Sequence, residues 1–390
     1  MTAGLYIHIP FCQRKCFYCD FYSIENTELI NQFVDYLILE IQQKVSAGKY
    51  SDLTFDTIFF GGGTPSLLSG TQISRILDPL HKNFKILDGS EITIECNPRT
   101  IDKEKLKAYQ KASINRLSIG VQSFLDSELN FLSRIHNANQ AKESLNLAFE
   151  SGFENLSIDL LFALPKQRQE DILFSLEEAY NFPLSHISYY NLTYEEETPL
   201  YQDLENGKIE PLSDDEESSL YLSIIKNLEQ QGFKQYEVSN FSKPNLQCKH
   251  NLKYWTDAPY IGFGPSAHSY FDNSRSKNVD DLLIYFNLLS KKEEPLIFSE
   301  ELSFKDRMME SIFLSLRADG LVLEQFAKEF FFDILFELRD LLLSLTLGGF
   351  LSIDKTKIKL TAKGYSLCDE ICLRIIKDIE NKDIEKIMRI

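Results

Sequence analysis

The sequence predicts an α/β fold, a partial (β/α)6 barrel followed by a small C-terminal winged-helix-like α+β domain. The first 200 residues alternate six short apolar runs with longer amphipathic stretches. The runs typical of strands are residues 5–9, 57–62, 91–96, 116–122, 155–162 and 186–193. Strands separated by helices form right-handed crossovers and a parallel sheet. Because six units are two short of a closed barrel, we expect an open, partial barrel, with an open doubly wound sheet as the alternative.

The stretches between these runs carry a helical period. After Asn26, the apolar residues Leu29, Phe33, Leu37 and Ile41 recur every fourth position, which predicts an amphipathic helix.

The rhythm changes after residue 200. Residues 213–233 predict a helix whose acidic first turn suits the helix dipole, and residues 235–241 predict a strand. From about residue 300 the chain is helix-rich, and residues 348–367 predict a hairpin-like pair of short strands. We therefore expect a barrel over 1–240, a loop and connecting segment over 241–298, and the winged-helix-like domain over 299–390.

The predicted strands have one apolar and one polar face. In residues 91–96 the isoleucines alternate with polar residues, and the same holds in residues 116–122 and 155–159. The polar faces end in Glu95, Gln122 and Asp159 at the C-terminal ends of their strands, where barrel enzymes carry their sites. This predicts a polar cavity that holds a ligand. An antiparallel sheet with one solvated face is the alternative, which the long helical spacers disfavour.

Composition narrows the function classes. The chain has 390 residues and a formal net charge of -17, and this acidity disfavours broad nucleic-acid binding. No apolar run is long enough to span a bilayer and no signal peptide precedes the first strand, so we expect a cytoplasmic protein. In that compartment an odd count of seven cysteines favours metal ligands over disulfides.

Three of the cysteines, Cys12, Cys16 and Cys19, follow the first strand with the spacing C-x3-C-x2-C. A structural zinc site needs four ligands, with His8 or the distant Cys248 as candidates for the fourth. A redox dithiol needs only two cysteines. A four-iron cluster held by three thiolates leaves one iron open to a small molecule, and that reading makes the missing fourth cysteine informative.

This motif resembles the radical S-adenosylmethionine (SAM) superfamily, in which the open iron chelates the methionine end of SAM. The resemblance implies a [4Fe-4S] cluster on Cys12, Cys16 and Cys19, with Tyr18 fitting the pattern. The reduced cluster of that superfamily cleaves SAM to a radical. The turn "GGGTP" (61–65) is similar to the superfamily's glycine motif, which implies SAM contacts by Gly62, Gly63 and Thr64.

The stretches "YIHIPFC", "IECNP", "RLSIGVQSF" and "LPKQ" resemble the subgroup that holds oxygen-independent coproporphyrinogen III dehydrogenase and the heme chaperones. The resemblance implies SAM contacts by Tyr6, Glu95, Gln122, Arg134 and Asp159. Three of these are the polar strand ends already identified. Without the resemblance Arg134 would be read as a solvated helix charge.

Two departures disfavour the dehydrogenase. Cys19 is followed by Asp20 and Phe21 instead of x-Cys, and the first strand begins near Gly4, which leaves no room for that enzyme's N-terminal arm. The stretch "HNLKYW" (250–255) matches a motif of the heme-chaperone branch.

That match implies heme contacts by His250, Tyr254 and Trp255. An imidazole is a common iron ligand, and aromatic rings offer a flat surface to a porphyrin. Cys248 is an alternative soft ligand. The structural alternative is a packed loop in which His250 is hydrogen-bonded and Trp255 is buried.

We therefore expect a heme chaperone that binds a [4Fe-4S] cluster, SAM and heme. Its expected partners are client hemoproteins of the respiratory chain, with peripheral membrane association only through them, and a homodimer is possible. The alternative is oxidative decarboxylation of coproporphyrinogen III. Whether SAM is cleaved or only bound stays open.

Overall fold

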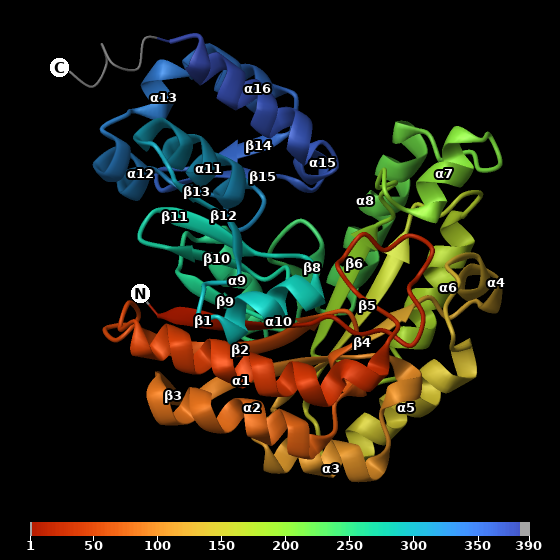
Figure 1. The fold of residues 1–390 in the computed structure, drawn as a ribbon. Coiled ribbons are helices and arrows are strands. Elements are labelled where there is room, and N and C mark those ends of the chain that lie inside the picture. Colours follow the sequence, from red (N-terminus) through yellow and green to blue (C-terminus); the bar gives the residue numbers. More distant parts are fainter. Residues whose placement is uncertain (1, 383–390) are drawn as a thin grey trace.

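The computed structural model describes residues 2–382, and a 12-stranded sheet forms its centre (Figure 1). The sheet runs in the order β12-β11-β10-β9-β1-β2-β3-β4-β5-β6-β8-β7. Its six central strands are parallel and in chain order: β1 (Ala3–Ile9), β2 (Thr54–Gly62), β3 (Lys85–Cys96), β4 (Arg116–Gln122), β5 (Asn155–Phe162) and β6 (His186–Asn191). A doubly wound sheet reverses its order at a switch point, whereas this order is that of a barrel. The predicted partial barrel is therefore confirmed.

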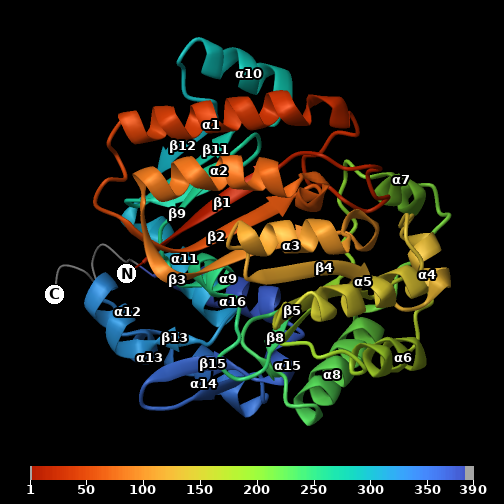
Figure 2. The same ribbon diagram turned by 90° about the horizontal axis from the view of Figure 1, so that it is seen from below.

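One layer of helices covers the outer side of these strands (Figures 1 and 2). The crossover helices are α1 (Ile30–Ser46), α2 (Gly70–Asn83), α3 (Lys103–Lys111), α5 (Ala138–Glu150) and α6 (Gln169–Ala179). In α1, Phe33, Leu37 and Ile41 are fully buried, as the period of four predicted. The apolar parity of the strands, such as Ile92 and Ile94, joins the same core and leaves the polar parity facing inward.

Residues 234–301 widen the sheet at both edges. At one edge, β8 (Asn240–Ser242) pairs antiparallel with β6 and with β7 (Lys234–Gln235). At the other, β9 (Tyr260–Phe263) lies parallel to β1 and is followed by β10 (His268–Phe271), β11 (Ser274–Asn278) and β12 (Leu296–Glu301).

Two expectations for this stretch are wrong. The predicted strand 235–241 is two short strands, because the chain turns between them where Tyr236 N donates to Asn240 O at 3.1 Å. The segment 241–298 is not a loop, since it contains β9, β10 and β11, parts of β8 and β12, and the helices α9 (Lys249–Trp255) and α10 (Leu282–Ser290). The division of the chain at residues 240 and 299 stays a prediction.

The C-terminal part has its own core and its own three-stranded sheet, in the order β13-β15-β14. Its elements are α11 (Phe304–Leu316), β13 (Leu321–Val322), α12 (Leu323–Phe330), α13 (Ile334–Glu337), α14 (Arg339–Leu347), β14 (Leu351–Ile353), β15 (Lys357–Leu360), α15 (Ala362–Tyr365) and α16 (Cys368–Glu380). Strands β14 and β15 are the predicted hairpin. This is the small α+β unit expected from the sequence.

Three further helices follow β4 and β6 in the chain, and the last of them packs beside α6 in the outer layer (Figure 2). They are α4 (Asp126–Phe131), α7 (Pro199–Glu205) and α8 (Asp214–Gln230). The predicted acidic helix corresponds to α8, which begins with a capping box between Ser213 and Glu216. Within residues 2–382, no helix is both long and apolar enough to cross a membrane.

Candidate functional site

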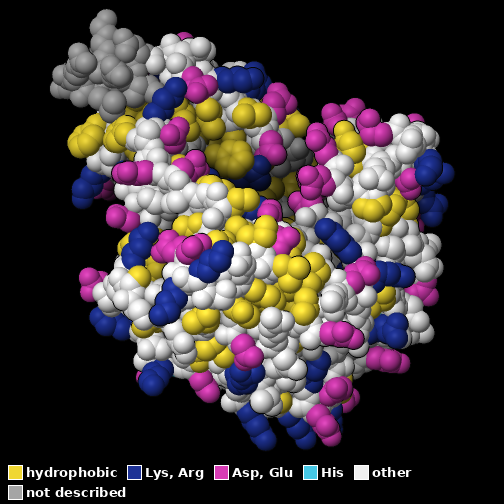
Figure 3. Space-filling model, in the orientation of Figure 1, with side chains coloured by type: hydrophobic (Ala, Val, Ile, Leu, Met, Phe, Trp, Pro, Cys, Tyr) yellow, Lys and Arg dark blue, Asp and Glu magenta, His cyan; other side chains and the backbone are white. Residues whose placement is uncertain are grey.

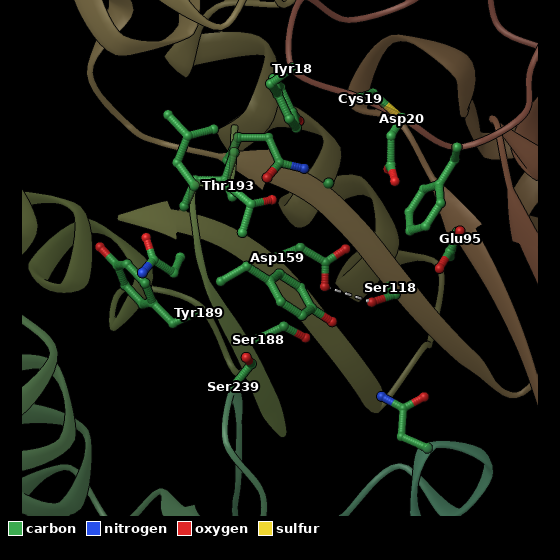
Figure 4. Close-up of a pocket in the computed structure, with 18 of the residues that line it drawn as sticks. Tyr18, Cys19, Asp20, Glu95, Ser118, Asp159, Ser188, Tyr189, Thr193 and Ser239 are labelled. Atoms are coloured by element: carbon green, nitrogen blue, oxygen red, sulfur yellow. Dashed lines mark hydrogen bonds between the residues drawn. The ribbon is translucent and has the colours of Figure 1, made fainter. Parts of the chain in front are cut away.

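A cavity of about 1300 Å³ opens at the C-terminal ends of the barrel strands and extends to α8, α15 and α16. Figure 3 shows the hollow between the C-terminal part and α8, and Figure 4 shows its polar interior. Thirteen of the fifteen predicted site residues line it: Tyr6, Cys12, Cys16, Tyr18, Cys19, Gly62, Gly63, Thr64, Glu95, Gln122, Arg134, Asp159 and Tyr254. His250 and Trp255 do not. The polar parity of the strands thus faces a single large cavity, as predicted.

The cysteine loop is pinned at its base and at its tip. Cys12 N donates to Ile24 O at 3.0 Å, and Ile24 N donates to Pro10 O at 2.8 Å, which closes the loop at the end of β1. At the tip, Phe17 N donates to Ser133 Oγ at 2.9 Å and Phe17 O accepts from Leu200 N at 3.1 Å. The loop therefore holds its three thiols in place from both sides.

All three thiols are free and partly exposed to the cavity. Burial raises the pKa of Cys19 to about 11. In the described part of the chain, no three His, Cys, Asp or Glu side chains lie close enough together to hold a single metal ion. Three separate thiols around an open cavity suit an iron–sulfur cluster that needs a further ligand from outside the chain.

A hydrogen-bonded chain of side chains connects two of the cysteines. Thr64 Oγ1 donates to Cys12 Sγ at 3.5 Å, and Asn97 Nδ2 donates to Thr64 Oγ1 at 2.9 Å. Arg134 completes the chain, because Nη2 donates to Asn97 Oδ1 at 2.5 Å and Nη1 donates to Cys16 Sγ at 3.1 Å. Arg134 is therefore no solvated helix charge. It fixes the positions of both sulfur atoms, and Asn97 is a member of the network that the sequence analysis missed.

The glycine turn brings bare backbone against the end of β1. Gly63 N donates to Ile9 O at 2.8 Å and Thr64 N donates to Phe11 O at 2.7 Å. Gly62 has a φ of +106°, and a Cβ added there would lie 2.7 Å from the ring of His8. Glycine is required at this point both by the backbone conformation and by the close approach.

The strand ends provide two carboxyl groups inside the cavity (Figure 4). Burial, and then the neighbouring carboxyl of Asp159, raise the pKa of Glu95 to about 8. Burial also raises the pKa of Asp159, which accepts a hydrogen bond from Ser118 Oγ at 3.1 Å. A carboxyl that stays protonated at neutral pH can donate as well as accept hydrogen bonds, so Glu95 suits a ligand with polar groups of either kind.

At the end of β4, Gln122 has a φ of +68° where the β4–β5 register shifts. Tyr6 lies across the barrel, and its hydroxyl and His8 Nδ1 share a hydrogen bond of 3.2 Å. Both side chains face the cavity, as their parity implies.

His250 has no ring nitrogen free to bind a ligand in this structure. Nδ1 shares a hydrogen bond of 2.8 Å with Thr57 Oγ1, and Nε2 shares one of 3.0 Å with the hydroxyl of Tyr254. The ring is fully buried and stacks on Phe59 at 5.1 Å between centroids. Trp255, at the end of the same helix, is half-buried.

His250 is buried because the start of α9 is anchored against the barrel interior by Glu91. The carboxylate of Glu91, on β3, accepts from the backbone N–H groups of Lys249 and His250 at 3.2 and 3.3 Å. A buried carboxylate thus satisfies the free N–H groups at the start of the helix and holds it against the barrel interior. The structural alternative for "HNLKYW", in which His250 is packed and hydrogen-bonded, therefore matches the position of His250. The segment is a helix, however, and not a loop.

Sequence analysis also missed Arg116. It is almost fully buried, lines the cavity, and precedes Ser118 and Gly120 on the inward parity of β4. The period of two that identified Gln122 would have identified Arg116 as well.

Comparison with known proteins agrees with this geometry. The Radical SAM superfamily matches residues 6–179. The heme chaperone HemW of Bacillus subtilis is 35% identical over 372 residues, which cover 94% of this chain and 97% of that protein. HemW of Escherichia coli is 37% identical over 68% of this chain and 69% of its own length.

Among solved structures, coproporphyrinogen III oxidase (HemN) from Escherichia coli, described as a radical SAM enzyme, has a TM-score of 0.82 at 26% identity. The match covers 96% of this chain and 90% of that one. The chain therefore belongs to the radical SAM superfamily and, within it, to the family of the heme chaperone HemW.

Proposed function

We propose that this protein is a heme chaperone that binds heme and passes it to client hemoproteins, including those of the respiratory chain, in the cytoplasm. The observation that carries the proposal is the 35% sequence identity to HemW of Bacillus subtilis, which extends over nearly the whole of both chains. The cavity supports it, because about 1300 Å³ exceeds the roughly 300–1,000 Å³ of ordinary small-molecule pockets. There is space for a second ligand beside SAM.

A radical SAM fold implies a [4Fe-4S] cluster and SAM, and the residues present fit both. We propose that Cys12, Cys16 and Cys19 hold the cluster, which supplies one-electron chemistry when bound. The Arg134 network positions the thiols, and the backbone of the glycine turn lies beside them. Glu95 and Asp159, deeper in the cavity, provide hydrogen-bonding groups for SAM.

The alternative function is oxidative decarboxylation of coproporphyrinogen III, which the likeness to HemN favours. The departure after Cys19 and the identity to HemW disfavour it. The decarboxylase activity is therefore the alternative function against which the heme chaperone has to be tested.

The test is a titration of the anaerobically reconstituted protein with hemin, followed in the Soret band. A heme chaperone predicts saturable binding near one heme per chain and subsequent transfer of that heme to an added apo-hemoprotein. Binding no stronger than to a non-specific carrier protein such as serum albumin would contradict the proposal. The proposal assigns no heme contact to His250 or Trp255, since neither side chain lines the cavity.

A further inference from the structure

We propose that His268, at the rim of the cavity, is the residue that ligates heme iron. The inference rests on the proposed heme binding and deepens it by naming the ligand. It replaces His250, which the sequence motif had indicated.

A comparison of the six histidines carries the argument. An iron ligand needs a neutral imidazole with a free nitrogen that reaches the ligand. Three of the others have both ring nitrogens hydrogen-bonded: His8 to Tyr6 and Tyr22, His186 to Ser157 and Tyr236, and His250 to Thr57 and Tyr254.

The remaining two lie away from the cavity. His136 is buried against the carbonyl of Val121, and His81 is exposed in the last turn of α2. Of the six, His268 alone both lines the cavity and is exposed. Within residues 2–382, no hydrogen bond to its ring contributes to the shift of its pKa.

The surroundings of His268 suit ligation. Burial and the neighbouring cations Lys277 and Arg275 lower its pKa, which favours the neutral imidazole that binds iron. The residue begins β10, where its ring meets Phe298 edge-on at 6.3 Å between centroids. An aromatic neighbour adds flat apolar surface beside the expected porphyrin plane.

Charge around the cavity also favours this side. His268 and Lys277 are direct partners in the β10–β11 ladder, so their side chains lie on the same face. Lys277 lines the cavity beside His268 and is 3.2 Å from the carboxylate of Asp280, whereas the wall formed by α8 and α16 carries Asp214 and Glu370. Heme propionates are anionic, so they would be attracted to the lysine side and repelled from the acidic one.

The position is compatible with a separate SAM site. His268 begins β10, which joins β1 through β9 at one edge of the barrel, while Glu95 and Asp159 lie on the interior strands β3 and β5. A heme on His268 would occupy the outer part of the cavity and leave the barrel interior to SAM.

The experiment compares wild type with His268→Ala, His250→Gln and the control His81→Ala, each reconstituted with its cluster and titrated with hemin. We expect His268→Ala to bind hemin at least about tenfold more weakly and to lose the optical and electron-paramagnetic signature of histidine-ligated heme, by analogy with the metal affinity lost when a ligand shell is disturbed. Free imidazole should restore the signature. His81→Ala should match wild type, and His250→Gln should keep the histidine signature.

An unchanged affinity and spectrum in His268→Ala would overturn this inference and leave heme binding intact. A signature lost only in His250→Gln would overturn it as well, and would mean that α9 leaves its seat to bind heme. Absence of saturable binding in the wild type would overturn the proposed function together with the inference.

Discussion

Replacing Gly62 by alanine tests how tightly the glycine turn is built against β1. The new Cβ would lie 2.7 Å from Cε1 of His8, and the backbone would keep a φ of +106°. His8 has little freedom to move, because its nitrogens bond to the Tyr6 hydroxyl at 3.2 Å and to Tyr22 O at 3.0 Å. The strained backbone costs about 1–3 kcal/mol and the overpacking about 1–3 kcal/mol.

We therefore expect Gly62→Ala to lower the free energy of unfolding by about 2–6 kcal/mol. The matched control is Gly207→Ala, because Gly207 has a φ of +66° and open space around its Cβ position. That change should cost only the left-handed backbone, about 1–2 kcal/mol. Denaturant unfolding of both variants under reducing conditions measures the difference. The reasoning fails if the two variants agree within about 0.5 kcal/mol, the size of an ordinary surface effect.

Three further predictions concern the cluster loop and α9. Arg134→Lys removes the planar guanidinium that bonds Cys16 and Asn97 and thereby positions the thiols. We therefore expect the affinity for SAM after reconstitution to fall about tenfold or more, as measured by equilibrium dialysis. An unchanged SAM affinity would refute this role of the network. Cys19→Ala should abolish full loading with iron and sulfide, whereas the control Cys96→Ala, at a buried cysteine, should keep it. Equal iron and sulfide contents in the two variants would show that Cys19 is not a cluster ligand. Burial lowers the pKa of His250 to about 3, below the 6.5 of the unfolded chain, so the unfolded state binds the extra proton and stability falls as the pH falls. The wild type should therefore lose about 2 kcal/mol more than His250→Gln between pH 7 and pH 5, and parallel stability curves would contradict this.

The barrel and the polar strand ends could be predicted because both depend on local periods. Alternation by two along β3 placed Ile94 in the core and Glu95 in the cavity, and the helical period in α1 placed Leu37 under the sheet. These patterns follow from backbone geometry alone, so distant contacts do not change them.

The seat of α9 could not be predicted in this way. His250 is buried because Glu91, 159 residues earlier, holds the start of its helix, and because Thr57 and Tyr254 occupy its nitrogens. The contacts with Glu91 and Thr57 join distant parts of the chain and leave no local pattern. For the same reason His268 did not attract attention, since its exposure depends on how β10 is placed beside β1 through β9.

The most direct test of the heme-chaperone proposal is a turnover assay with coproporphyrinogen III. The reconstituted protein is incubated anaerobically with SAM, a reductant and the porphyrinogen, and the porphyrins are separated after oxidation. The account predicts no decarboxylated porphyrin above the protein-free control from a preparation that binds hemin. Decarboxylated product that depends on SAM, with one SAM consumed per propionate lost, would contradict it and identify the protein as the dehydrogenase.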